Sequence, residues 1–243
     1  MKVRHIDFPE RRDGYGAADT EKTPAGCRDR RGTAVGRSGC KPSPVCGHGI
    51  GDSQHAGHGG ADGGAVSDSG VPESGINLAI TQRLGGVLSF CGHTVALTRE
   101  GEDALCDGTG TLRQQKVSDT KKRVELVNSF PHGFLISIHQ NSLPGHPTVR
   151  GAQSFHNGKG TAETAALSIQ QLLNSAVNER EKDARRMDDS IYLMKHADCS
   201  AVLVECGFLS NPEETVLLQQ PDYQLHIAAA IAAGFCQYCT NEG

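Results

Sequence analysis

The chain has 243 residues, of which 37% are hydrophobic and 21% charged, and its formal net charge at pH 7 is −4. Nucleic-acid-binding proteins usually carry a clear basic excess, so this charge balance speaks against that class. The sequence contains no run of about 18 apolar residues, so no transmembrane helix is expected.

The first part of the chain differs in composition from the rest. Residues 1–50 carry ten Lys and Arg against six Asp and Glu, and residues 9–34 contain no Ile, Leu, Val, Phe or Met. Such a segment buries too little apolar surface to offset the entropy cost of ordering it. Its start also lacks the apolar stretch of a secretory signal. We therefore expect residues 1–52 to be disordered or atypical and residues 53–240 to form one domain.

The first half of this domain alternates between helical and extended patterns. Apolar side chains recur at helical spacing from Ile76 to Cys91, which predicts a helix over 75–90. A strand is expected over 93–99, followed by a polar loop and a helix that Ser118 caps. Residues 134–138, FLISI, are continuously apolar, which is typical of a buried central strand.

The second half of the domain repeats the alternation. Strands are expected over 151–156, 191–194 and 201–206, and helices over 161–177 and 223–238. A further helix is expected after Asn211, which would be its N-cap, with Pro212 at the first helical position and Glu214 at the third, reaching back to the cap. Strands that alternate with helices predict an α/β domain with helices on both faces of a mainly parallel or mixed sheet.

The nine cysteines are odd in number and irregularly spaced, which is a poor disulfide framework. Cys236 and Cys239 form a CxxC inside the last predicted helix, with no second such pair to complete a zinc cluster. We expect them to be inert helix positions, and a redox or metal role is the alternative. Cys40, Cys46 and His48 lack a fourth ligand at a convincing spacing, which argues against a metal knuckle there.

Polar residues with metal-binding chemistry stand at the ends of predicted strands, where function gathers in open α/β sheets. His58 lies in a glycine-rich loop that Glu73 follows, His139 comes directly after FLISI, and Glu205 ends another apolar run. Two imidazoles and one carboxylate are the ligand set of a catalytic zinc site, beside which Glu205 would transfer protons. Each residue also has a structural interpretation, as a loop or core histidine, a helix-start charge or a strand-end acid. Spacing alone does not decide between the two.

Several motifs of the domain occur together and in a fixed order: AGHGGADGGAV with Glu73 and Asn77, VALTRE, KRVELVN, FLISIHQNS, GAQSFH and VLVECGFLSNPEE. Over residues 56–238 this pattern closely resembles the zinc-dependent N-acetylmuramoyl-L-alanine amidases of bacterial cell-wall turnover. The germination-specific amidases of spore formers are the most similar branch. Asn77, Arg99, Asn141 and Ser142 also match family positions, without a role that we can assign from the sequence.

The resemblance implies a three-layer α/β/α sandwich around a mixed, mainly parallel sheet, and it makes residues 53–240 the catalytic domain. It implies one Zn²⁺ ion held by His58, Glu73 and His139, with Glu205 as the catalytic acid and base. The reaction would cleave the amide between the lactyl group of N-acetylmuramic acid and L-alanine in peptidoglycan. An extracytoplasmic location and an accessory cell-wall protein are further expectations.

The sequence departs from the family just before the first histidine. An apolar strand normally stands there, whereas this chain has GIGDSQHAGHGG, so we expect the N-terminal strand to be poorly encoded or missing. A shifted reading frame or an altered gene start is one hypothesis for residues 1 to about 55. Two other functions stay open: a catalytically impaired peptidoglycan-binding remnant, and a zinc carboxypeptidase-like peptidase. The peptidase would need an arginine for the substrate carboxylate, and Arg99, Arg123 and Arg150 are candidates by type.

Overall fold

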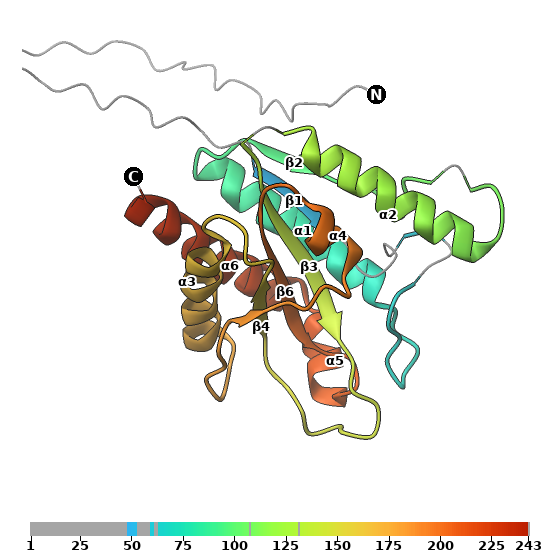
Figure 1. Ribbon diagram of the computed structural model, residues 1–243. Helices are drawn as coiled ribbons and strands as arrows, with labels where there is room; N and C mark the ends of the chain where they lie inside the picture. The colour runs from blue at the N-terminus through green and yellow to red at the C-terminus, as the bar shows by residue number, and fades with distance from the viewer. Residues whose placement is uncertain (1–47, 53–58, 61–62, 107, 131, 243) are drawn as a thin grey trace, which may run out of the picture. The chain divides into compact units, whose positions relative to one another are not determined.

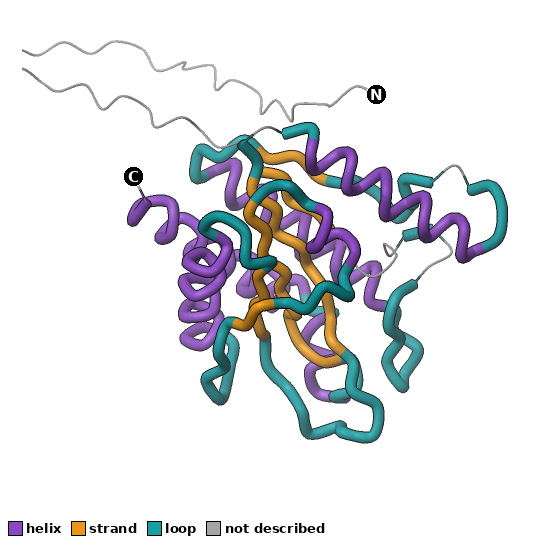
Figure 2. The backbone as a smooth tube through the Cα atoms, viewed as in Figure 1, coloured by secondary structure: helices purple, strands orange, loops and turns teal. Residues whose placement is uncertain are grey.

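The computed structural model describes residues 48–52, 59–60, 63–106, 108–130 and 132–242. Most of the expected atypical segment, residues 1–47, therefore lies outside the described residues, and so does His58. Figure 1 shows the arrangement of the helices and strands, and Figure 2 separates them from the loops that join them.

The described strands form one six-stranded sheet in the order β2-β1-β3-β6-β4-β5. They comprise β1 (His48–Asp52), β2 (Val95–Leu97), β3 (Phe134–Asn141), β4 (Gln153–His156), β5 (Arg185–Arg186) and β6 (Ser200–Phe208). The first four strands in this order are mutually parallel, β4 is antiparallel to β6, and β5 is parallel to β4. The sheet is therefore mixed and mainly parallel, as predicted.

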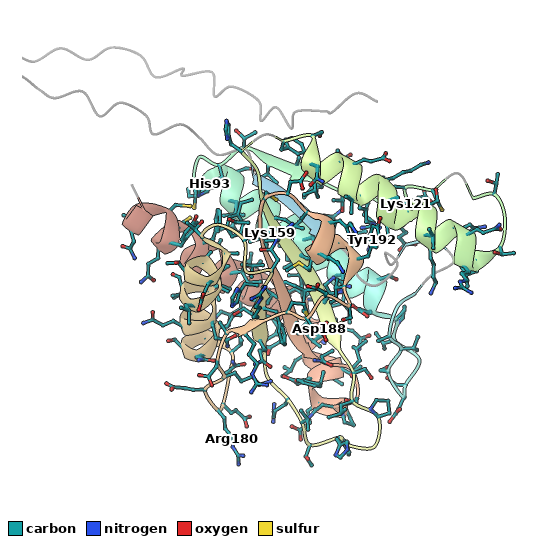
Figure 3. The ribbon with its side chains drawn as sticks, viewed as in Figure 1. His93, Lys121, Lys159, Arg180, Asp188 and Tyr192 are labelled. Carbon is teal, nitrogen blue, oxygen red and sulfur yellow. The ribbon has the colours of Figure 1, made fainter. Side chains whose placement is uncertain are left out.

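Helices cover both faces of the sheet, which confirms the three-layer α/β/α architecture. They comprise α1 (Glu73–Phe90), α2 (Leu112–Asn128), α3 (Ala162–Ala176), α4 (Tyr192–His196), α5 (Pro212–Leu218) and α6 (Pro221–Glu242). One apolar core joins the sheet to α1, α3 and α6, and a second joins it to α2 and α4. In Figure 3 the layer of α2 and α4 is marked by Lys121 and Tyr192.

The central strand β3 contributes to both cores. Phe134, Ile136 and Ile138 face α1, α3 and α6, whereas Leu135 faces α2 and α4. Successive side chains of a strand point to opposite faces, so a strand covered on both sides is apolar throughout. The same alternation places His139 on the face of Leu135.

The prediction that the N-terminal strand is missing was wrong. Strand β1 lies between β2 and β3 and pairs in parallel with both. Its sequence, HGIGD, contains two glycines and one large apolar residue. Strand pairing uses the backbone N–H and C=O groups, which glycine supplies like any other residue. A search for apolar runs therefore overlooks this strand.

Two other local predictions were also wrong. Residues 191–194 were expected to be a strand, but α4 begins at Tyr192, and short apolar runs do not distinguish a strand from a helix. Helix α2 begins at Leu112, ahead of the expected Ser118 cap. Thr111 is its N-cap and forms a reciprocal capping box with Gln114.

The cap of α5 was predicted correctly only in part. The Asn211 side chain accepts a hydrogen bond from the Glu214 backbone N–H, as expected for an N-cap. The carboxylate of Glu214 does not reach back to the cap, because it accepts hydrogen bonds from the backbone N–H groups of Gly151 and Phe208. Glu214 thus ties α5 to β6 and to the loop before β4.

The CxxC cysteines both lie on α6, as predicted. The Cys236 sulfur is 3.4 Å from Nε2 of His93, and burial, together with the neighbouring Cys91 and Cys239, raises the pKa of Cys236 to about 11. A thiol with such a pKa is protonated at neutral pH and reacts slowly. This favours the structural interpretation of Cys236.

Candidate metal centre

The expected site residues meet at the carboxyl ends of the central strands. His139 of β3 lies directly opposite Glu205 of β6, so their side chains share one face of the sheet. Beyond this pair β3 advances two residues to Asn141 while β6 advances three to Phe208. The extra residue of β6 is a β-bulge, a feature that redirects side chains beside active sites.

Glu73 and His139 are in direct contact. The Nδ1 atom of His139 lies 3.1 Å from Oε1 of Glu73, and both side chains are fully buried. The other ring nitrogen, Nε2, lies 3.0 Å from the Ser137 hydroxyl. Two ligands on one tetrahedral zinc ion, each about 2.0–2.1 Å from it, are separated by roughly 3.3 Å. The separation of Glu73 and His139 therefore fits a shared ion.

The Glu73 carboxylate is held by hydrogen bonds at the first residue of α1. The side-chain amide of Asn77 and the backbone N–H of Gln140 donate to Oε1, and the backbone N–H of Ala65 donates to Oε2. These three donors hold the buried carboxylate of Glu73 in one orientation, which suits a metal ligand.

Glu205 has a carboxyl group with a raised pKa. Burial raises the pKa of its carboxyl group to about 7, while His139 opposes this shift and Glu73 adds to it. Its Oε2 atom is buried and has no hydrogen-bond partner among the described residues. An unpartnered buried carboxylate oxygen is costly, so its place beside the contacting pair fits a site that takes up another group.

His58, the third expected ligand, lies outside the described residues. Its neighbours in sequence, Gly59 and Gly60, approach the loop after β2, where the Gly60 N–H donates to the Glu102 carbonyl oxygen at 2.6 Å. A β-carbon at Gly59 would lie 3.2 Å from the same oxygen. Within the described ranges no group of three or more His, Cys, Asp or Glu side chains is gathered around a metal position. Among the expected site residues, the structure places Glu73 in contact with His139 and pairs His139 with Glu205 across β3 and β6.

The comparison with protein families decides the relationship. Residues 55–237 match the Amidase_3 family, described as N-acetylmuramoyl-L-alanine amidase. The chain belongs to this amidase family. The match covers every described strand except β1, and all the described helices up to the last residues of α6.

Individual amidases support the same conclusion. The chain is 38% identical over 189 residues to the germination-specific N-acetylmuramoyl-L-alanine amidase of Bacillus subtilis, covering 77% of this chain and 78% of that protein. The Escherichia coli amidase AmiA is 25% identical over 226 residues, covering 75% and 73% of the two chains.

A solved structure shows the same fold. The CwlD amidase of Clostridioides difficile, determined in complex with the GerS lipoprotein, superposes with a TM-score of 0.74 at 34% identity. The alignment covers 80% of this chain and 99% of that one. The catalytic domain of CwlV from Paenibacillus polymyxa gives a TM-score of 0.65 at 26% identity, covering 80% and 98%.

The arginines that a peptidase would need have other partners. Arg99 donates to the carbonyl oxygens of Ser74 and Gly101, and Arg123 pairs with Asp119 at 2.7 Å in a fully buried position. Arg150 bridges two exposed carboxylates, those of Glu179 in the loop after α3 and Glu213 in the first turn of α5. All three side chains are therefore engaged within the protein itself.

Sequence reasoning missed the supporting residues of Glu73. Gln140 was not singled out, and Asn77 was noted as a family position without a role. Asn77 follows Glu73 by four residues, which puts the two side chains on one face of α1. This spacing is the one feature of the sequence that pointed to the contact.

Proposed function

We propose that the chain is a zinc-dependent amidase that hydrolyses the bond between N-acetylmuramic acid and L-alanine in peptidoglycan. The observation that carries the proposal is the 3.1 Å contact between the buried carboxylate of Glu73 and the buried imidazole of His139. Glu205 lies next to this contact, directly across from His139, in a chain of the amidase family.

Glu73 and His139 are proposed as two ligands of one zinc ion, with His58 as the third. The donor set of two imidazoles and one carboxylate is that of catalytic zinc sites. A zinc ion bound there would supply Lewis-acid chemistry, polarising the scissile carbonyl and lowering the pKa of water.

A search of the described residues for membrane-spanning helices found none of sufficient length and hydrophobicity.

Ser137 is placed to support His139 in this role. An imidazole that binds a metal through Nδ1 carries its proton on Nε2, which would donate to the Ser137 oxygen 3.0 Å away. A hydroxyl group both donates and accepts, so Ser137 can also serve the opposite tautomer in the metal-free protein. Ser137 thus keeps the ring in one orientation in both states.

Glu205 is proposed as the general base and general acid. A carboxyl group with a pKa near neutrality accepts the proton of the attacking water and later returns it to the leaving amine of L-alanine. The residue as a whole is partly exposed, although its Oε2 atom is buried. Proton transfer of this kind contributes about 10²- to 10⁴-fold to a rate.

The two alternative functions receive less support. The remnant was suggested because the strand before His58 seemed missing, yet β1 occupies that position in the sheet. The peptidase would need a free arginine for a terminal carboxylate, whereas Arg99, Arg123 and Arg150 are engaged in internal contacts.

The relatives also suggest where and with what the chain acts. One is named for germination, and the structure of another was solved in complex with a lipoprotein. We propose a cell-wall location outside the cytoplasm, a role in spore germination or cortex maturation, and an accessory protein of the cell envelope as partner.

A metal assay coupled to digestion of purified peptidoglycan tests the function. An amidase binds about one equivalent of zinc, releases glycan with free lactyl groups and exposes new L-alanine amino termini. Release of carboxy-terminal amino acids would indicate the peptidase instead. Binding of peptidoglycan without any cleavage product would indicate the remnant.

A further inference from the structure

Two buried amide side chains are linked by hydrogen bonds to the proposed zinc ligand Glu73, and neither has an assigned role. Asn77, fully buried, stands one turn after Glu73 in α1, and Gln140 directly follows His139 in β3. The Nδ2 atom of Asn77 donates to Oε1 of Glu73 at 2.9 Å. The Nε2 atom of Gln140 donates to Oδ1 of Asn77 at 3.1 Å. The three side chains thus form a continuous chain of hydrogen bonds.

The orientation of the Asn77 amide is fixed from both ends. Its N–H group faces a carboxylate, which only accepts, and its carbonyl oxygen faces the amide nitrogen of Gln140, which only donates. Rotating the amide by half a turn would place oxygen against oxygen and nitrogen against nitrogen. The contact with Gln140 is therefore compatible only with the orientation in which Asn77 presents its donor to Glu73.

The pair also joins two elements that carry the proposed ligands. Successive residues of β3 point to opposite faces, so His139 meets Glu73 from one face while Gln140 meets Asn77 from the other. The backbone N–H of Gln140 donates to the same Oε1 atom at 3.1 Å. Helix α1 and strand β3 are thereby held at a fixed distance at the level of the site.

We propose that Asn77 and Gln140 are a positioning pair that holds the Glu73 carboxylate in the orientation for zinc. The proposal rests on the zinc function proposed above and adds residues that act through Glu73. Outer partners of metal ligands commonly change metal affinity by about 10- to 100-fold when they are removed. Gln140 acts through Asn77, so its loss should matter only while Asn77 is present.

The test is a double-mutant cycle on zinc affinity in the full chain. The affinities of wild type, Asn77→Ala, Gln140→Ala and the double variant are measured by competition with a chromogenic chelator. We expect Asn77→Ala to weaken zinc binding by about 10- to 100-fold and Gln140→Ala to weaken it less. The double variant should bind zinc as Asn77→Ala does, because the two residues act in series.

Gln170→Ala is the matched control. Gln170 is a buried glutamine of α3 whose hydrogen bonds go to Ala152, Ser154 and Asn174 and not to Glu73 or His139. Its loss should lower the melting temperature and leave zinc affinity unchanged. Cobalt(II) substitution adds a spectroscopic reading, since visible bands of Co(II) report ligand geometry. They should shift in Asn77→Ala and stay unchanged in Gln170→Ala.

Three results would overturn the proposal: wild-type zinc affinity in Asn77→Ala, losses in Asn77→Ala and Gln140→Ala that simply add, or an equal loss in Gln170→Ala. If Asn77→Ala does not fold, Asn77→Leu fills the volume without a donor and takes its place. A wild-type chain that binds no zinc would instead refute the proposed function itself, which separates the two failures.

Discussion

The Nδ1 atom of His139 lies 3.1 Å from Oε1 of Glu73, although the two residues are 66 positions apart in the sequence. The contact joins the first residue of α1 to the end of the central strand β3. It brings a carboxylate and an imidazole into direct contact, and both side chains are fully buried. In the proposed function, this buried pair supplies two of the three zinc ligands.

Replacing His139 should abolish zinc binding. His139→Ala removes one proposed ligand and leaves Glu73 without its imidazole neighbour, so the loss should exceed the roughly 10- to 100-fold effect of an outer partner. Metal analysis of the purified variant after dialysis measures this. Ser137→Ala is the comparison, because it removes only the hydroxyl beside Nε2 and should reduce affinity more mildly. A full equivalent of zinc in His139→Ala would remove His139 from the ligand set.

Replacing Glu205 should separate metal binding from catalysis. Glu205→Gln keeps the size of the side chain but cannot accept a proton, so turnover should fall by about 10²- to 10⁴-fold. Zinc content should stay near the wild-type value, since Glu205 is not a proposed ligand. Release of new L-alanine amino termini from peptidoglycan measures the rate. Wild-type turnover in this variant would show that another group moves the proton.

The stability of the metal-free protein should depend on pH through Glu205. Burial raises the pKa of this carboxyl group from 4.5 to about 7, so the folded state holds the proton more tightly than the unfolded state. The free energy of unfolding should therefore fall as the pH rises from about 4.5 to 7, with no further contribution from Glu205 above that range.

Urea unfolding in the presence of a chelator, repeated across this pH range, provides the measurement. Glu205→Gln has no carboxyl group to titrate, so its stability relative to wild type should increase steadily from about pH 4.5 to 7. Parallel pH profiles for the two proteins would contradict the assignment of this titration to Glu205.

Two glycines in helices should respond oppositely to alanine. A β-carbon added at Gly234 of α6 would lie 2.6 Å from the Cα atom of Ile169 in α3. A β-carbon added at Gly86 of α1 would have no atom within 4 Å, apart from its chain neighbours and the backbone of its own helix. Gly234→Ala should destabilise the protein by about 1–3 kcal/mol or more through overpacking. Gly86→Ala should stabilise it by roughly 0.5–1 kcal/mol through helix propensity. Thermal unfolding measures the stability of both variants. Similar changes in stability in the two would contradict the close approach of α3 and α6.

The parts of the fold that follow from side-chain pattern were predictable, and the parts that follow from the backbone were not. Strands β3 and β6 are covered on both faces, so their sequences are continuously apolar and the prediction was correct. Strand β1 also has a neighbouring strand on each side, but its two glycines give no apolar pattern. The two exposed arginines of β5 likewise carry no strand pattern.

The candidate site was predictable to a similar degree. Glu73, His139 and Glu205 could be proposed because each stands at a strand end or helix start and matches a family motif. The Asn77–Gln140 contact could not, because a hydrogen bond between two amides 63 positions apart leaves no periodicity in the chain. Only the folded arrangement of α1 against β3 reveals it.

The position of β1 sets a limit on how far the N-terminal segment can be trimmed. Among the described strands, β1 is the sole neighbour of β2, and it connects β2 to β3. A protease that cuts before residue 48 leaves the sheet whole. A cut after residue 52 would separate β1 from the rest of the chain, and without β1 the described part of β2 would have no neighbouring strand.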